Sequence, residues 1–141
     1  MKSTVLDNIP FKINIERLFK RIHIESDSEY GGQARALARK AEEIGRPKVF
    51  YTLSYIDAKE ESSIIVDGVK LTSRVMRVNF NDIHRVFPYV ATCGRELFEW
   101  AEGVEDILER FWADTIMEMA LASALEYYHA HLEERYQLGK V

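Results

Sequence analysis

A stretch without proline or glycine, from Val104 to about Leu138, constrains the fold of this chain more than any other feature. As one α-helix it would be roughly 50 Å long at the standard rise per residue. Its middle is apolar almost all round, and such a helix is normally enclosed by other elements. The apolar residues are Phe111, Trp112, Ile116, Met117, Met119, Ala120, Leu121, Ala122, Ala124 and Leu125. The sequence therefore predicts one long C-terminal helix that is covered on most sides.

Two shorter helices are expected near the N-terminus. Apolar residues recur at helical spacing from Ile15 to Ile22, and Asn14 precedes them as a candidate N-cap. A second helix is predicted over residues 33–44, because Gly45 is a natural residue to follow a helix end and Pro47 prevents its continuation.

The segment between these helical regions predicts strands and turns. Asp67-Gly68 is typical of a tight hairpin turn, Ser73 can cap a brief helix, and Pro88 indicates an edge position or a bulge. A polar turn over 57–62 and a helical turn over 96–101, stopped at Gly103, are also expected. The expected strands are residues 3–10, 49–56, 63–66, 69–72 and 85–91. Together these patterns predict an α+β fold: a small, mostly antiparallel sheet packed against the long helix, in a single domain over residues 1–141.

Composition limits the class of protein. The chain has 141 residues, is 47% hydrophobic, and carries 19 Lys+Arg against 23 Asp+Glu, for a net charge of −4. This balance gives no support to binding of nucleic acid or of an anionic membrane. The most apolar stretch, residues 115–125, is too short and too charged to cross a bilayer, and the N-terminus lacks the apolar run of a secretory signal. With Cys93 as the only cysteine, no intrachain disulfide can form, and we expect a soluble, cytoplasmic protein.

Asp114 and Glu118 lie four residues apart and so share one face of the long helix. Two carboxylates in an apolar region could form an acid/base pair or half of a dimetal site. The Glu-x-x-His partner helices of such a dimetal site are missing. The alternative, which we favour, is that each carboxylate bonds a backbone group or an arginine such as Arg110.

No other residue predicts independent catalysis or metal binding. Cys93 could be nucleophilic at a helix N-terminus, but lone cysteines are more often small buried hydrophobes. Cys93 and His84 have no further ligand at zinc-like spacing, and His129 and His131 lie on different helix faces. Gly31-Gly32 matches no phosphate-binding signature and is interpreted as a flexible loop. We therefore expect no catalytic constellation and no metal site.

In their order along the chain these segments resemble the reactivation (activation) domain of cobalamin-dependent methionine synthase, in its small stand-alone form. The resemblance runs from the N-terminal helix through Arg46-Pro47-Lys48-Val49, the Asp67-Gly68 hairpin and the segment 71–75. The closest piece is Val90-Ala91-Thr92-Cys93-Gly94, which is similar to the family's strand ending in a Thr-x-Gly turn. Asp114 stands where the family has an aspartate early in its long, small-residue-rich helix.

The resemblance implies a function. Domains of this family dock on the corrinoid of a cobalamin-carrying methyltransferase partner after its cobalt has been oxidised. They position S-adenosylmethionine for reductive remethylation, with an electron from a flavodoxin-like donor. The cofactor carries the chemistry in such a reaction, which fits a chain without a catalytic dyad or triad. The resemblance places the cofactor-binding residues at Thr92, Cys93, Gly94, Arg95 and Asp114.

One part of the family pattern is not matched. The family's S-adenosylmethionine site uses an Arg-x-x-x-Gly-Tyr motif beyond the long helix, whereas Arg135 and Gly139 are followed here by Lys140. The sequence ends at Val141, where that segment should begin. Either the chain continues naturally beyond this point, or this member keeps the scaffold without the nucleoside site.

Two other functions compete with corrinoid docking. The first is a non-enzymatic interaction module that self-associates through apolar groups at the end of the long helix: Leu125, Tyr128, Leu132, Tyr136 and Leu138. The second is a free-standing hydrolase that uses Asp114 and Glu118. Corrinoid docking predicts a concave, largely apolar surface near residues 92–95 and the first half of the long helix.

Overall fold

The computed structural model describes residues 2–139 and has an α+β architecture, as predicted. Within this range the helices are α1 (Ile15–Ile22), α2 (Gly31–Ile44), α3 (Arg74–Asn79), α4 (Arg95–Glu102) and α5 (Ile107–Arg135). The strands are β1 (Lys2–Leu6), β2 (Lys48–Lys59), β3 (Ser63–Val66), β4 (Val69–Thr72), β5 (Arg85–Val86) and β6 (Tyr89–Thr92). Backbone contacts divide the described residues into two units. The sheet unit contains residues 2–5 and 50–90, and the helical unit contains residues 6–49 and 91–139.

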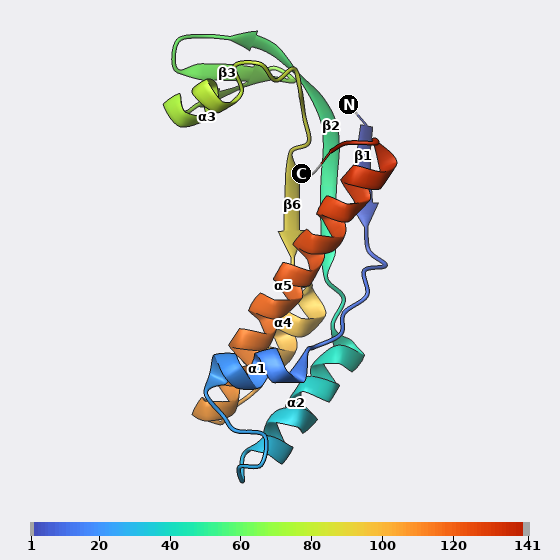
Figure 1. Ribbon diagram of the computed structural model, residues 1–141, viewed down its shortest axis with the longest axis vertical. Coiled ribbons are helices and arrows are strands. Elements are labelled where there is room, and N and C mark those ends of the chain that lie inside the picture. Colours follow the sequence, from blue (N-terminus) through green and yellow to red (C-terminus); the bar gives the residue numbers. More distant parts are fainter. Residues whose placement is uncertain (1, 140–141) are drawn as a thin grey trace. The chain divides into compact units, whose positions relative to one another are not determined.

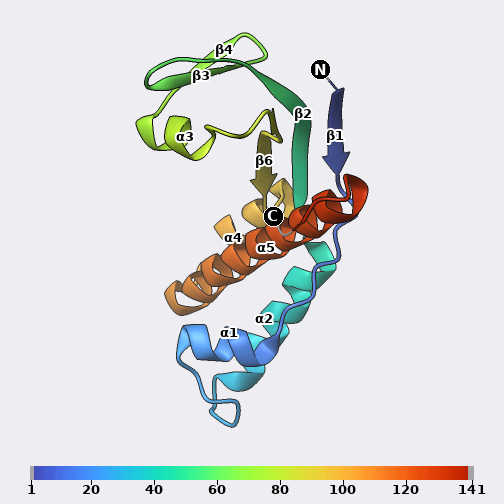
Figure 2. The ribbon, with the colours of Figure 1, turned by 45° about the horizontal axis from the view of Figure 1, so that its top comes forward.

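The helical unit is built around α5, which α1, α2 and α4 all contact (Figures 1 and 2). Leu18, Leu97 and Trp112 are completely buried in its core. Alanines on two helices let the backbones approach closely. The other core members are Ile13, Phe19, Ile22, Ala34, Ala38, Ala41, Ile116 and Ala120. Burial of this apolar surface is the main force that holds the four helices together.

Helix α5 is shorter and less enclosed than its sequence predicted. It begins at Ile107, because the Asp106 side chain accepts a hydrogen bond from the backbone N–H of Glu109 at 2.9 Å and so acts as the N-cap. It ends at Arg135. The prediction of cover on most sides is wrong for one face, since 51% of Phe111 is exposed. The core of the helical unit contacts a different face of α5, which contains Trp112, Ile116 and Ala120.

The two N-terminal helices confirm one predicted cap and correct one predicted loop. Asn14 caps α1, its Oδ1 accepting from the backbone N–H of Arg17 at 3.1 Å. Helix α2 already begins at Gly31, so the interpretation of Gly31-Gly32 as a flexible loop is wrong. Gly45 follows α2 as predicted, with an ordinary φ of −65°. Glycine is needed there because an added Cβ would lie 2.7 Å from the ring of Phe11.

The sheet unit is organised by β2, which pairs with β1, β3, β5 and β6, and β4 then pairs with β3. Every pair with a resolved register, β2–β3, β2–β5 and β3–β4, is antiparallel. The hairpin at Asp67-Gly68 is confirmed, with φ of 49° and 80° at its two turn residues, as a type I′ turn requires. Ser73 caps α3 as predicted by accepting from the N–H of Met76 at 3.2 Å.

Strand boundaries in the sheet unit differ from those predicted. The expected strand over 85–91 is split into β5 and β6, because Pro88 has no N–H to continue the ladder. Its carbonyl still accepts from the backbone N–H of Thr52 at 3.0 Å. Strand β2 continues to Lys59 through part of the predicted turn, and β1 ends at Leu6, short of residue 10.

In the part of the chain that the structure describes, no helix combines the length and the hydrophobicity needed to cross a membrane.

Candidate functional site

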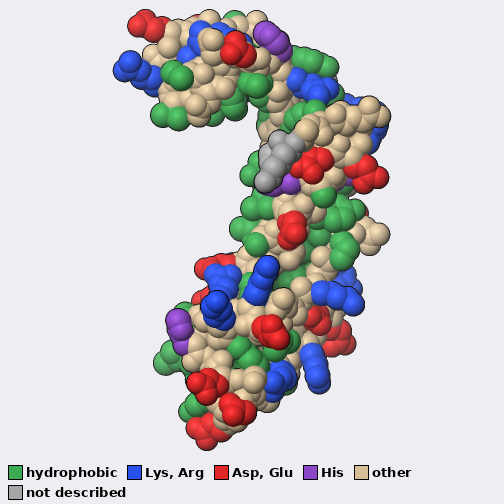
Figure 3. Space-filling model, viewed as in Figure 1, with side chains coloured by type: hydrophobic (Ala, Val, Ile, Leu, Met, Phe, Trp, Pro, Cys, Tyr) green, Lys and Arg blue, Asp and Glu red, His purple; other side chains and the backbone are tan. Residues whose placement is uncertain are grey.

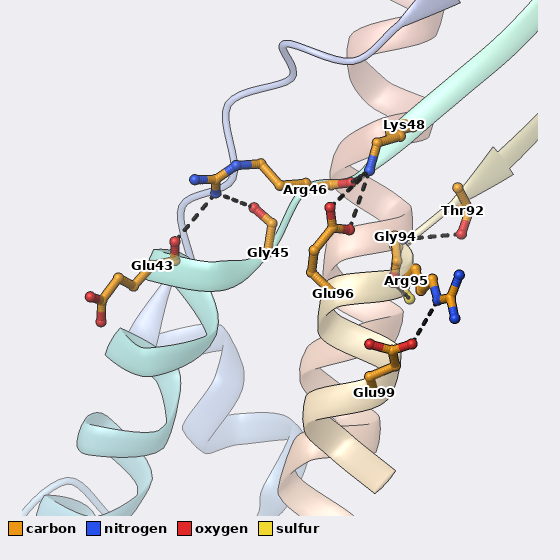
Figure 4. Close-up of polar contacts among 10 residues, drawn as sticks. Glu43, Gly45, Arg46, Lys48, Thr92, Gly94, Arg95, Glu96 and Glu99 are labelled. Carbon is orange, nitrogen blue, oxygen red and sulfur yellow. Dashed lines mark hydrogen bonds and ion pairs between the residues drawn. The ribbon is translucent and has the colours of Figure 1, made fainter. Parts of the chain in front are cut away.

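Four of the five predicted site residues, Thr92 to Arg95, lie where the chain turns from the end of β6 into the start of α4. The Thr92 hydroxyl accepts a hydrogen bond from the backbone N–H of Gly94 at 3.0 Å (Figure 4). Gly94 has φ 96°, a conformation that residues with a side chain rarely adopt. A Cβ at this position would lie 2.4 Å from the carbonyl oxygen of Arg46. Gly94 is therefore required both by its backbone conformation and by its contact with the 46–48 segment.

Ionic contacts hold this turn against the segment that leads into β2. Lys48 Nζ donates to the Arg46 carbonyl at 3.0 Å and to Glu96 Oε1 at 3.2 Å (Figure 4). The pKa of Glu96 is lowered by a hydrogen bond from its own backbone N–H and further by Lys48. The Arg46 guanidinium donates to the Gly45 carbonyl at 2.7 Å. Two segments named in the family resemblance, 46–49 and 92–94, thus meet in the structure.

An open hollow of about 570 Å³ lies beside this turn, on the surface of the helical unit. The turn contributes Thr92 and Cys93, and α5 contributes the exposed carboxylates Asp114 and Glu118. The remaining lining residues are Ala91, Met117 and Leu121. Its volume is within the range of small-molecule sites, although it is far more open than a typical enclosed pocket.

Thr92, Cys93 and Asp114 of the predicted site share this hollow, whereas Gly94 and Arg95 do not line it. Gly94 shapes the turn. The Arg95 side chain is exposed, and its Nε donates to Glu99 Oε1 at 2.6 Å, one helical turn along α4. That hydrogen bond raises the pKa of Arg95. Arg95 is thus held along α4 by an ion pair.

Both carboxylates of the hollow have arginine partners. Arg110 Nε donates to Asp114 Oδ1 at 3.0 Å, which confirms the favoured interpretation for this residue. Glu118 forms an ion pair with Arg21 of α1. A general base needs a carboxylate free to take a proton. Asp114 and Glu118 each accept a hydrogen bond from an arginine. They are therefore better suited to hold those arginines in place, or to accept hydrogen bonds from a ligand, than to act as a general base.

Cys93 is half-buried, and its thiol donates to the carbonyl of Gly94 at 3.7 Å. Burial raises the pKa of the Cys93 thiol, although the residue lies just before a helix N-terminus. A raised pKa keeps the thiol protonated near neutral pH, whereas a nucleophilic cysteine needs the thiolate. The geometry therefore favours the interpretation of Cys93 as a packing residue that borders the hollow.

Metal ligands do not cluster in the described residues: no group of three or more His, Cys, Asp or Glu side chains is placed to hold an ion.

Two surfaces of the helical unit contain residues that the sequence interpretation did not assign to a site. The first is a set of exposed apolar side chains on α4 and α5: Phe98, Ile107, Leu108, Phe111 and Leu121. The second is a cradle of about 320 Å³ between α1 and α5, lined in part by Lys12, Arg17 and Arg21. The four-residue spacing of the two arginines places them on one face of α1 and could have indicated this cradle.

In comparisons with known proteins, no protein-family model matches the chain and no curated protein matches it.

Proposed function

We propose that this protein is an accessory domain for the reductive reactivation of a cobalamin-dependent methyltransferase of the methionine synthase type. It would dock on the corrinoid of its partner through the hollow beside the Thr92–Cys93 turn. One observation carries the proposal. The turn and the first half of α5, which are the two segments closest to the family pattern, border one hollow although about 20 residues separate Cys93 from Asp114.

The chemistry of the surrounding surface supports docking of a broad ligand. Ile107 is 89% exposed and Phe111 is 51% exposed. Helical spacing places Ile107, Phe111, Asp114, Glu118 and Leu121 along one face of α5. Exposed apolar side chains gathered in this way are typical of binding surfaces. A corrin ring offers a wide, largely apolar face with amide groups at its rim. The N–H groups of those amides can donate hydrogen bonds to the carboxylates of Asp114 and Glu118.

The side chains of this protein indicate which part of the reaction it would perform and which part the partner's cofactor would perform. Cobalt supplies the redox and methyl-transfer chemistry when the partner brings it, and this chain orients and shields the corrinoid. An electron would come from a flavodoxin-like donor, and the setting would be the cytoplasm. S-adenosylmethionine is proposed as the methyl source by resemblance alone. Arg135 is the last residue of α5, whereas Lys140, which departs from the family motif, lies outside the described residues.

The corrinoid spectrum tests the proposal directly. A cobalamin-carrying domain of a methionine synthase, prepared in the Co(II) state, is titrated with this protein while its absorption spectrum is recorded. We expect a saturable change, because docking over the corrin face alters the environment of the cobalt. An unchanged spectrum at saturating protein would contradict corrinoid docking.

A matched pair of variants tests where the partner binds. Phe111→Asp places a charge beside the hollow, and Val75→Asp places the same charge on α3 of the sheet unit, where Val75 is 71% exposed. We expect Phe111→Asp to weaken the spectral titration at least about tenfold, since an interface residue at the centre of a docking surface commonly contributes that much. Val75→Asp should leave the titration unchanged. Equal effects would exclude the α5 face as the docking surface.

The two competing functions lack such support. Of the five apolar residues suggested for self-association, Tyr128 and Leu132 are buried and the other three are half-buried, so these side chains form no continuous exposed apolar surface. The hydrolase would need a free carboxylate, and Asp114 and Glu118 are both paired with arginine.

A further inference from the structure

The cradle between α1 and α5 gathers positive charge that the proposed function does not use. Lys12 precedes α1, and Arg17 and Arg21 lie one helical turn apart on it. In Figure 3, Lys and Arg side chains lie beside Asp and Glu side chains over the part of the surface that α1 and the middle of α5 occupy in Figure 1. In a chain with a net charge of −4, three cations and a single carboxylate, Glu126, line this cavity, so the sign of the charge is locally reversed. Such a reversal attracts anions to this place on the surface.

Two of these cations have no side-chain partner among the residues that the structure describes. The Arg17 guanidinium forms no hydrogen bond or ion pair with a described residue, although its backbone N–H donates to Asn14, and no ion pair within residues 2–139 involves Lys12. The third cation, Arg21, is paired with Glu118. Two arginines on one helix face can present their planar N–H groups to the oxygens of a single phosphate, and a lysine adds a further donor.

The α5 side of the cradle is suited to a short uncharged part of a ligand rather than to a second anionic group. Met119 contributes apolar surface and Glu126 contributes a carboxylate. Ser123 donates its hydroxyl hydrogen to the Met119 carbonyl at 3.1 Å, so its oxygen lone pairs can only accept. Glu126 and Ser123 therefore favour a ligand that also carries a hydroxyl donor. A cavity of about 320 Å³ has room for such a group beside a phosphate.

We propose that the α1–α5 cradle binds a small phosphate monoester that carries a hydroxyl group, with the phosphate on Lys12, Arg17 and Arg21 and the hydroxyl directed to Glu126. This site is separate from the hollow beside Cys93, but the two share one ion pair: Arg21 lines the cradle, and its partner Glu118 lines the hollow. A phosphate that takes Arg21 competes with Glu118. The bound ester thereby releases a carboxylate toward the hollow.

Isothermal titration with glycerol 3-phosphate, inorganic phosphate and citrate tests the chemical class. We expect saturable binding of glycerol 3-phosphate that is tighter than binding of inorganic phosphate and that weakens as salt rises. Absence of saturable binding by glycerol 3-phosphate at low salt would overturn the site. Tighter binding of citrate would overturn the assignment to a phosphate ester.

Two pairs of variants locate the site and test the shared ion pair. Arg17→Gln should weaken binding about tenfold, whereas Arg39→Gln, which removes the same charge from an exposed position on α2, should change it less than about twofold. Glu118→Gln should tighten binding about two- to fivefold by freeing Arg21, and Glu43→Gln on α2 should not. Each variant is first checked for an unchanged circular dichroism spectrum. Equal effects within either pair would mean that only net charge matters and would overturn the proposal.

Discussion

The helical unit and the sheet unit place their apolar side chains differently. In the helical unit Leu18 and Trp112 are fully buried, and alanines let the helices approach closely. In the sheet unit the short helix α3 contacts β3, yet Val75 and Val78 on its outer face are 71% and 66% exposed. Similar apolar residues thus contribute to a core in one region and remain in solvent in the other. What decides their role is whether a second layer covers them.

The largest expected effect tests this difference in burial. Leu18→Ala removes a fully buried side chain and should lower the free energy of unfolding by about 4 kcal/mol, because a cavity remains among the helices. Val78→Ala removes apolar atoms that are already exposed and should cost less than about 0.5 kcal/mol. Urea denaturation of both variants measures the two changes. Similar losses would show that the outer face of α3 is covered in solution.

The second effect compares a positive-φ glycine in each unit. Gly94→Ala should lower the free energy of unfolding by about 3 kcal/mol, because the new Cβ meets the Arg46 carbonyl and the backbone conformation is strained. Gly68→Ala meets only the strain, since nothing lies within 4 Å of its added Cβ, and should cost about 1 kcal/mol. Thermal unfolding of the two variants measures the difference between their losses of stability. A harmless Gly94→Ala would contradict the close contact of the 92–95 turn with residues 46–48.

Helix caps give a smaller contrast. Asp106→Ala removes the cap of the long helix α5 and should cost about 1 kcal/mol in the free energy of unfolding. Ser73→Ala removes the cap of the six-residue α3 and should cost about 0.5 kcal/mol. Denaturant unfolding, supplemented by amide hydrogen exchange in each helix, separates the two losses. A greater loss from Ser73→Ala than from Asp106→Ala would contradict the expectation that the cap of the well-packed helix α5 contributes more to stability than the cap of α3.

The smallest expected effect is a dependence on pH. Lys70 hydrogen bonds to Glu60 at 2.8 Å and lowers the pKa of that carboxyl in the sheet unit, and the pKa of Glu96 is lowered in the helical unit. Each group favours the folded state above the ordinary pKa of glutamate, and this contribution is lost as pH falls through the lowered pKa. Unfolding followed from about pH 6 to about pH 3 should show a slight loss of stability. Glu60→Gln and Glu96→Gln should each flatten that slope.

Local chemistry explains which features were predictable from the sequence. Asn14 and Ser73 were predicted as caps because a short polar side chain can satisfy a free backbone N–H within three residues. The Asp67-Gly68 hairpin followed from the backbone conformation that its turn demands. The break in the strand at Pro88 was anticipated only as an edge or bulge, because whether a missing N–H ends a strand depends on its partner.

Contacts between distant residues were predictable only in part. The pairing of Asp114 with Arg110 was anticipated, because both lie on one helix at a spacing of four. The pairing of Glu118 with Arg21 was not, since it joins α5 to α1 across 97 positions. The exposure of Phe111 was not predicted, for a related reason. Periodicity shows that a helix is apolar on many sides, but not which of those sides its neighbours will cover.

The sequence by itself determined the α+β class, the long C-terminal helix, the hairpin and the caps Asn14 and Ser73, because each depends on backbone propensity and on residues a few positions apart. Only the tertiary structure decided that Cys93 and Asp114 border one hollow, that Gly94 must lie against Arg46, and that three cations surround a cradle between α1 and α5. These features depend on which helix faces pack together. Packing is set by the fit of many side chains at once, and no local pattern in the chain contains it.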